Sequence, residues 1–559
     1  MTMTRRGFVS GATAAAVGMV AGRSGGGAAA APRSQGEFPI GEAPAIVPMP
    51  WLRRDGRFFR AEDGRTTILR GVDYAFNSVG LVDLRFDLTN ADLDRIASWG
   101  MNALRIRLRD ARAGYFPSRP AEPGYLEELD RLIARANDRG LYVIVATGGP
   151  EDLLSIGKHP EDPLHDCAKF LPGNPAREHW FGYLEGIVRR YRDWPGVVGF
   201  DLINEDISYP PEIHDAVFMG PAHQEALARL RAVDDRHVYF QQPAGWDYQG
   251  HSVASGYDLG DPNRFFASKW GVRPGENVQR LEEMLGWAVE AGTDLFLAEY
   301  NLSDRGTLEV ATMEAVQREV LALLDGALIS GLRLGYLPAV SGALISEARE
   351  EAFWLAEMVR PYPVWIGGVV TSLAWDFDAA KLRLELALDG RGPTELAVSI
   401  ARTYPGGFIA TTAAGDRLTV SNAHDVVAAG ALRWDERAGR IVLAAGKGAE
   451  TLTLLPLDPS VAPERPRARV ADLDQYETVI MAQLDDLELP EGAAASLIER
   501  LVQSGEFTTE QARCIVEQLA DRLEPWQFGL LVGNATLPHT LAESIGQTVY
   551  ECVEAELGA

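Results

Sequence analysis

Two glutamates in this chain stand where chemistry could take place, each directly after a short apolar run. Glu205 follows Asn204 at the end of the run 197–203, and Glu299 closes the run 295–298. Two carboxyl groups that face one sugar about 5–5.5 Å apart can cleave a glycosidic bond with retention of configuration. One attacks the anomeric carbon, while the other donates and later recovers a proton. The pair therefore predicts glycosidic bond cleavage, provided that both runs are strands of one barrel.

The elements around these glutamates alternate between strand and helix from about residue 51 to residue 358. Eight strand–helix units in about 300 residues are typical of a (β/α)8 TIM barrel. A doubly wound open sheet is the rival, but the expected glycine-rich phosphate loop after an early strand is missing. Strands are expected at 68–73, 103–108, 141–146, 197–205, 237–242, 264–268, 295–299 and 331–337, and helices at 88–99, 125–139, 175–192, 222–233, 276–290, 308–324 and 346–359.

Composition and pattern divide the chain further. Residues 50–360 form the predicted barrel, and 361–457 carry short alternating strands that predict a small all-β sandwich. Residues 458–470 are rich in Pro and Arg and read as a linker, and 471–559 predict an acidic helical domain. Cys514 and Cys552 share this last domain, so an oxidising destination favours a disulfide between them. Cys167 is expected to be a free or partly buried thiol.

Charge and the N-terminus indicate where the protein works. The formal net charge of −26 argues against nucleic acid and anionic membranes as partners and fits a neutral carbohydrate. Residues 1–31 contain Arg5-Arg6 followed by a weakly apolar Ala/Gly/Val stretch, which predicts a twin-arginine signal peptide. No later stretch is long and apolar enough to span a bilayer. We therefore expect a soluble, exported protein without a transmembrane segment, whose oligomeric state the sequence leaves open.

Several motifs together resemble glycoside hydrolase family 5. The run 100–106, Gly-Met-Asn-Ala-Leu-Arg-Ile, is similar to that family's second-strand signature, and 199–205 is similar to its fourth strand with the Asn-Glu pair. Glu299 matches the nucleophile position on the seventh strand. The stretches 360–363, 372–377 and 402–407 resemble the endoglycoceramidase-like branch, which carries a C-terminal β domain. The resemblance covers roughly residues 50–457.

The resemblance implies a role for each candidate residue. By this resemblance Glu299 would be the nucleophile and Glu205 the acid/base. Two close carboxyl groups cannot both ionise cheaply, so one of them is expected to keep a proton. Arg105 would lie beside Glu299 and hold it ionised, and Asn204 would hydrogen-bond the sugar 2-hydroxyl. Aromatic residues in the loops after three strands could contact the sugar rings: Trp246, Trp270 and Tyr336. His237, at the opposite end of the barrel, is expected to be structural. No cofactor or metal site is expected.

Other positions depart from the family pattern. Asp206 stands where a proline usually follows the Asn-Glu pair, and the third strand ends in Thr147 and glycines rather than in a histidine. The sixth strand offers Trp270 in place of the family's tyrosine, and the eighth offers Tyr336 in place of a tryptophan. These losses motivate a second interpretation, in which a catalytically decayed barrel acts as a carbohydrate-binding or surface-interaction protein.

Overall fold

The fold is that of a computed structural model. It describes residues 46–74, 88–108, 113, 123–148, 170–204, 219–242, 261–272, 278–290, 294–302, 310–336, 343–346, 349–421, 427–435, 438–461, 463, 493–503, 508–522 and 552. Within these ranges, no helix has both the length and the apolar content needed to cross a bilayer.

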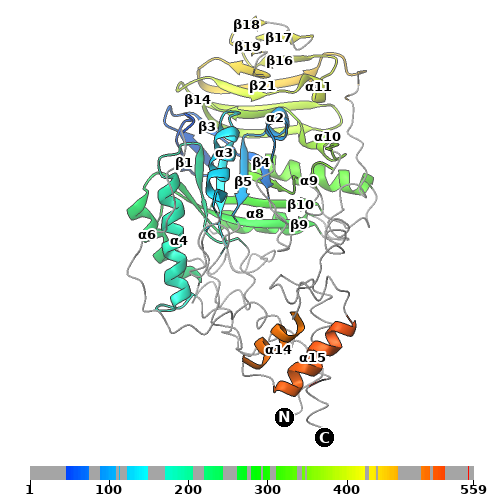
Figure 1. Ribbon diagram of the computed structural model, residues 1–559. Helices are drawn as coiled ribbons and strands as arrows, with labels where there is room; N and C mark the ends of the chain where they lie inside the picture. The colour runs from blue at the N-terminus through cyan, green and yellow to red at the C-terminus, as the bar shows by residue number, and fades with distance from the viewer. Residues whose placement is uncertain are drawn as a thin grey trace.

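A closed eight-stranded parallel barrel forms the centre of the molecule, as the sequence predicts (Figure 1). Helices cover the outside of the barrel, which is the arrangement of a (β/α)8 fold. In barrel order the strands are β10 (Leu295–Leu302), β11 (Gly331–Leu334), β4 (Arg70–Tyr74), β5 (Ala103–Arg107), β6 (Tyr142–Ala146), β7 (Val197–Asp201), β8 (Val238–Gln241) and β9 (Arg264–Val272). The helices are α2 (Asn90–Ser98), α3 (Tyr125–Asn137), α4 (Pro175–Tyr191), α6 (Gly220–Val233), α8 (Gln279–Glu290) and α9 (Val310–Ala327).

Local sequence sets the ends of helix α2. The Thr89 side chain accepts a hydrogen bond from the backbone N–H of Asp92, and the Asp92 carboxylate accepts one from the backbone N–H of Thr89. This capping box satisfies two N–H groups that would otherwise lack helical partners. Gly100 then takes a φ of 80°, which favours glycine and ends the helix.

Strand alternation divides the side chains between the barrel interior and the helices. On β5, Ala103 belongs to the interior cluster, whereas Leu104 and Ile106 pack outside with the helices. Because strand side chains alternate, Arg105 and Arg107 share the interior face with Ala103. The interior cluster is completed by apolar residues from the other strands, namely Tyr142, Ile144, Val198, Val238, Phe240, Phe265, Ala267, Phe296, Ala298 and Leu332.

A small antiparallel sheet closes the amino-terminal end of the barrel. It consists of β1 (Leu52–Asp55), β2 (Phe58–Ala61) and β3 (Thr66–Thr67). Phe59 enters the interior cluster, where its ring centroid lies 4.7 Å from that of Phe265 and 6.2 Å from that of Phe296. With this end filled by side chains, the carboxyl ends of the strands are left to carry a site.

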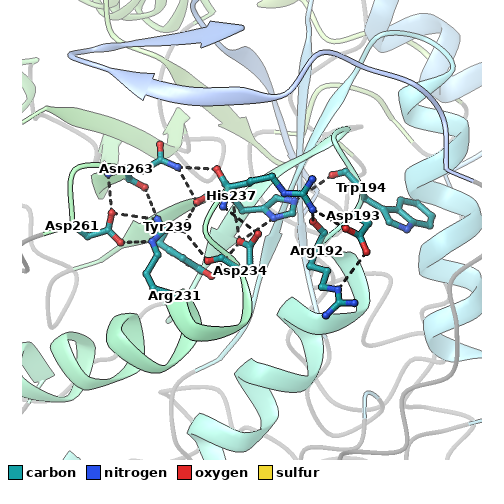
Figure 2. Close-up of polar contacts among 10 residues, drawn as sticks. Arg192, Asp193, Trp194, Arg231, Asp234, His237, Tyr239, Asp261 and Asn263 are labelled. Carbon is teal, nitrogen blue, oxygen red and sulfur yellow. Dashed lines mark hydrogen bonds and ion pairs between the residues drawn. The ribbon is translucent and has the colours of Figure 1, made fainter. Parts of the chain in front are cut away.

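Polar contacts stabilise the same amino-terminal end (Figure 2). The buried His237 places Nδ1 3.0 Å from the Asp234 carboxylate and Nε2 3.2 Å from the carbonyl oxygen of Trp194. Arg231 of α6 donates to the Asp261 carboxylate at 2.6 Å and to the carbonyl oxygen of His237 at 2.9 Å. His237 therefore joins the starts of neighbouring strands, in agreement with the expected structural role.

Asp234 carries a prediction about stability. Burial alone would raise its pKa, but the hydrogen bond and charge of His237 and two backbone N–H groups hold the pKa below its usual value. A lowered folded-state pKa stabilises the fold above pH about 4, and that contribution is lost as the pH falls through the folded value. Asp234→Asn should lower the free energy of unfolding by about 1–3 kcal/mol at pH 7, and the difference from wild type should become smaller at acidic pH. Urea unfolding at pH 7 and pH 3 measures this, and a constant gap would contradict it.

The residues after the barrel form the predicted all-β sandwich. Two five-stranded antiparallel sheets face each other around an apolar core. One sheet contains β12 (Tyr362–Trp365), β15 (Thr394–Ala397), β20 (Arg440–Leu443), β19 (Leu432–Asp435) and β18 (Ala428–Ala429). The other contains β13 (Gly368–Asp376), β14 (Lys381–Asp389), β21 (Lys447–Pro456), β16 (Phe408–Thr412) and β17 (Arg417–Val420), and the short helix α11 spans Ile400–Thr403.

A buried ionic cluster joins this sandwich to the barrel. Asp325 of α9 accepts hydrogen bonds from Arg70 of β4 and Arg360, each at 2.7 Å. Arg70 also donates to the Tyr362 hydroxyl of β12 at 3.1 Å. Breaking a buried ion pair would leave an unpaired buried charge, which is costly. The cluster therefore holds the sandwich in a fixed position against the barrel.

The helix expected at 346–359 is wrong over most of its length. Among the described residues of this stretch, α10 (Leu355–Met358) is the helical part, and Arg349 has a φ of 61° next to an isolated bridge between Ile345 and Glu351. Arg349 donates to Asp92 at 2.9 Å, and Glu351 accepts from the Trp99 indole at 3.3 Å. These contacts to helix α2 hold the segment in a non-helical conformation despite its helical pattern.

The C-terminal region contains two described helices, α14 (Ala493–Gln503) and α15 (Thr509–Arg522). Cys514 of α15 forms a disulfide with Cys552, which confirms the expected pairing. Cys167 and residues 1–31 lie outside the described residues.

Candidate active site

Charged side chains gather at the carboxyl ends of the barrel strands. Arg105 of β5 is fully buried and lies at the centre of the group. It donates to Asp73 of β4 at 3.0 Å, to Asp201 of β7 at 2.7 and 3.0 Å, and to Glu299 of β10 at 3.1 Å. One guanidinium therefore binds carboxylates from three strands, which ties the sequence-predicted residues Arg105 and Glu299 together.

Burial alone would lower the pKa of Arg105. The carboxylates of Asp73, Asp201 and Glu299 reverse that effect and raise the pKa well above its usual value. Arg105 is consequently a permanent cation, and its charge favours the ionised form of each carboxylate that it contacts.

An irregularity in β10 brings Glu299 to the interior. Phe296 and Ala298 face the barrel interior, so plain alternation would turn Glu299 outward. The register with β9 shifts between Leu297 and Glu299, and Tyr300 packs outside. A bulge of this kind re-aims a side chain next to a site. Here it places the Glu299 carboxylate, 3% exposed, against Arg105.

A second arginine, Arg107, lies on the same face of β5. It donates to Asp73 at 2.7 and 3.1 Å, and its Nη2 lies 2.5 Å from Oε2 of Glu299. Both oxygens of Glu299 thus contact a guanidinium. Arg107 was not among the residues predicted from the sequence, although its spacing of two residues from Arg105 within one strand places both on the same face.

Asn204 is held at the end of the fourth barrel strand. Its side-chain oxygen accepts from Arg105 at 2.7 Å, and its backbone N–H donates to the carbonyl oxygen of Thr147 at 2.8 Å. These contacts fix which way the amide faces. Glu205 is the next residue in the chain and lies outside the described residues, so the Glu205–Glu299 separation is not part of this geometry.

The remaining sequence candidates have different outcomes. Trp246 lies outside the described residues, and Trp270 lies in β9 in register with Tyr300, with its side chain outside the description. Tyr336 is 1% exposed, and its hydroxyl donates to Asp92 of helix α2 at 2.8 Å. The structure therefore places Tyr336 in the core beside α2 rather than on a surface that could meet a sugar.

Besides Arg107, three further polar residues of the site were not selected from the sequence. They are Asp73, Asp201 and Gln242, whose amide donates to Asp201 at 2.6 Å. Each one lies within one residue of the carboxyl end of a barrel strand, which was the signal that could have found them. Across the part of the chain that the structure describes, no group of three or more His, Cys, Asp or Glu side chains is arranged to hold a metal ion.

A buried glutamate at the carboxyl end of a (β/α)8 barrel is compatible with a glycoside hydrolase, and the comparisons with known proteins assign the chain to this class. Residues 63–324 match the family model of the cellulases, glycosyl hydrolase family 5. The barrel is therefore a glycosyl hydrolase family 5 domain, and the endoglycoceramidases are the members that the chain resembles.

Two curated endoglycoceramidases match part of the chain. The one from Cyanea nozakii is 21% identical over 262 residues, and the one from Hydra vulgaris is 21% identical over 215 residues. The alignments cover 36% and 28% of this chain, and the chain spans 51% and 41% of the length of these relatives.

Solved structures share the fold over a larger part of the chain. Endo-glycoceramidase II from Rhodococcus sp. aligns with a TM-score of 0.56 and 18% identity, covering 71% of this chain and 99% of that chain. A crystal structure of endogalactoceramidase aligns with a TM-score of 0.54 and 17% identity, covering 73% of this chain and 100% of that chain. At such identities the likeness concerns the fold.

Proposed function

We propose that this protein is a retaining β-glycosidase that hydrolyses O-glycosyl bonds in the manner of an endoglycoceramidase. The observation that carries the proposal is the clamped Glu299, buried at the carboxyl end of the barrel with a guanidinium on each oxygen. Glutamate in this state is an ionised nucleophile with a fixed orientation.

The first chemical step uses Glu299 and Glu205. Glu299 attacks the anomeric carbon and forms a glycosyl-enzyme, while protonated Glu205 donates its proton to the leaving oxygen. In the second step Glu205 takes a proton from water, which releases the sugar with its original configuration.

The charges around Glu299 support such a reaction. Two guanidiniums, of Arg105 and Arg107, contact three carboxylates, of Asp73, Asp201 and Glu299, which leaves a net charge of −1 on the group. An oxocarbenium-like transition state carries developing positive charge, so a buried anionic group stabilises it. Asn204, oriented by Arg105, is the residue proposed to bind the sugar 2-hydroxyl.

The proposed substrates are β-glycosides, with glycolipids of the glycosylceramide type as the natural class. The likeness to endoglycoceramidases supports this choice. The proposed location is outside the cytoplasm after twin-arginine export, for which Arg5-Arg6 and the following stretch are the support.

The test is hydrolysis of aryl β-glycosides and a glycosylceramide panel by the chain lacking residues 1–31, with the released sugar followed by proton NMR. A β-anomer as the first product is expected. An α-anomer as the first product would contradict the retaining mechanism. Sugar binding without turnover across the panel would favour the alternative of a non-catalytic carbohydrate-binding barrel.

A further inference from the structure

Two arginines and two carboxylates form a closed ring at the site. Arg105 Nη1 contacts Oδ1 of Asp73 at 3.0 Å and Oε1 of Glu299 at 3.1 Å. Arg107 Nη2 contacts the other two oxygens, Oδ2 of Asp73 at 2.7 Å and Oε2 of Glu299 at 2.5 Å. Each carboxylate therefore gives one oxygen to each arginine, and the plane of the Glu299 carboxylate is set from both sides.

The two arginines differ in their position along β5. Arg105 is completely buried, whereas the side chain of Arg107 is 17% exposed. Residue 107 also lies two positions further toward the carboxyl end of the strand, about 6.6 Å along it, which is the end where barrel enzymes bind substrate. Arg107 thus contacts Glu299 from the open end of the barrel, and Oε2 is the oxygen on that side.

Other charged residues close to Glu299 in the barrel lie on three further strands. Asp73 of β4 accepts hydrogen bonds from Nε and Nη2 of Arg107, and Asp201 of β7 accepts hydrogen bonds from Arg105. Lys269 of β9 is in register with Glu299, and its side chain lies outside the description. Removing Arg107 would take away its guanidinium from Oε2 of Glu299, while Arg105 would still bind Oε1.

We infer that Arg107 is a positioning residue that promotes the second chemical step, the release of the sugar from Glu299. This inference rests on the proposed function. In that step the oxygen of water bonds to the anomeric carbon, and the bond between that carbon and the Glu299 oxygen breaks. The electron pair returns to the Glu299 carboxylate, and the proton of water passes to Glu205. A guanidinium already aligned on Oε2 stabilises the departing carboxylate as its charge forms.

Arg107 should have only a small effect on the rate of the first chemical step. When Glu299 attacks, its carboxylate loses charge, so the ion pair with Arg107 weakens in that transition state and gives no electrostatic benefit there. The alignment of the carboxylate by Arg107 still helps, and Arg105 keeps the group ionised. In the first step the alignment of the carboxylate favours the reaction and the ion pair with Arg107 opposes it. In the second step both favour the reaction.

Arg107→Met separates the two steps. With a dinitrophenyl β-glycoside, whose leaving group makes the first step fast, kcat should fall about 10- to 100-fold and kcat/KM by less than about threefold. KM should fall together with kcat because the glycosyl-enzyme accumulates, and the acid limb of kcat/KM should move to higher pH. Arg107→Lys should restore part of kcat. The matched control is Arg60→Met, which removes a part-buried arginine bonded to Asp55 away from the site and should keep the wild-type kcat and KM.

A double-mutant cycle provides a readout that does not need activity. Arg107→Met, Glu299→Gln and the double variant are compared by urea unfolding, and a coupling of at least about fivefold in the unfolding equilibrium constant is expected. If the effects of the two substitutions on the unfolding equilibrium were additive, the energetic coupling of Arg107 to Glu299 would be ruled out, whether or not the protein hydrolysed a substrate. Unchanged kcat and pH profile in Arg107→Met, with an active wild type, would overturn the inference and leave the proposed function standing. Inactive wild-type protein with a coupled cycle would remove the proposed function, and with it the role in sugar release, while confirming the ring.

Discussion

Glu299→Gln is expected to lower kcat/KM on a β-glycoside by at least about a thousandfold while the barrel stays folded. An amide cannot form the glycosyl ester, so the double displacement loses its nucleophile. The fold should survive because the wild-type group holds two guanidiniums and three carboxylates, and removing one carboxylate balances these charges. One arginine would then face the amide NH2, which should cost about 1–3 kcal/mol.

Azide distinguishes a nucleophile from an acid/base residue. In Glu299→Ala, azide should enter the space left by the side chain and attack the anomeric carbon, giving an α-glycosyl azide from a β-glycoside. Glu205→Ala should give a β-glycosyl azide, because azide there attacks the glycosyl-enzyme. Product configuration by NMR is the measurement. A β-azide from the Glu299 variant, or near wild-type hydrolysis by Glu299→Gln, would reverse or remove the assigned role.

The repeating part of this fold could be predicted from the sequence. Apolar spacing and capping signals such as Thr89 and Gly100 act locally, so the eight barrel strands, most of the helices that cover them and the ends of α2 follow from them. The sandwich was predicted with several of its short alternating strands, including 417–420 and 440–443, which are β17 and β20. Strands β18 and β19 were not predicted, and their two and four residues carry little alternation.

The site was only partly predictable for a physical reason. Glu299 and Arg105 could be selected from motif and position, but the bulge that turns Glu299 inward depends on pairing between β10 and β9. The role of Arg107 depends on a carboxylate from β4, which is 34 residues away in the sequence. Such contacts arise from barrel closure, and local sequence does not encode them.

Arg105→Met is expected to lower the free energy of unfolding by about 3–5 kcal/mol at pH 7 and to reduce hydrolysis to the background rate. The variant would leave the buried carboxylates of Asp73 and Asp201 without the cation that they share, and Glu299 would lose its contact on Oε1. Protons can replace the missing charge, so the loss of stability should shrink as the pH falls from 7 toward 5. Urea unfolding at both pH values measures this dependence.

The matched variant for this prediction is Arg190→Met. Arg190 of α4 pairs with Asp130 of α3, and both side chains are fully buried in a helix interface outside the barrel interior. Arg190→Met should lose a similar amount of stability, because it also leaves a buried carboxylate, that of Asp130, without its arginine partner. Below its unfolding midpoint it should nevertheless hydrolyse substrate at the wild-type rate. If Arg105→Met and Arg190→Met were equally active at equal folded fractions, Arg105 would be only a structural residue, and its contact with Oε1 of Glu299 would not be needed for hydrolysis.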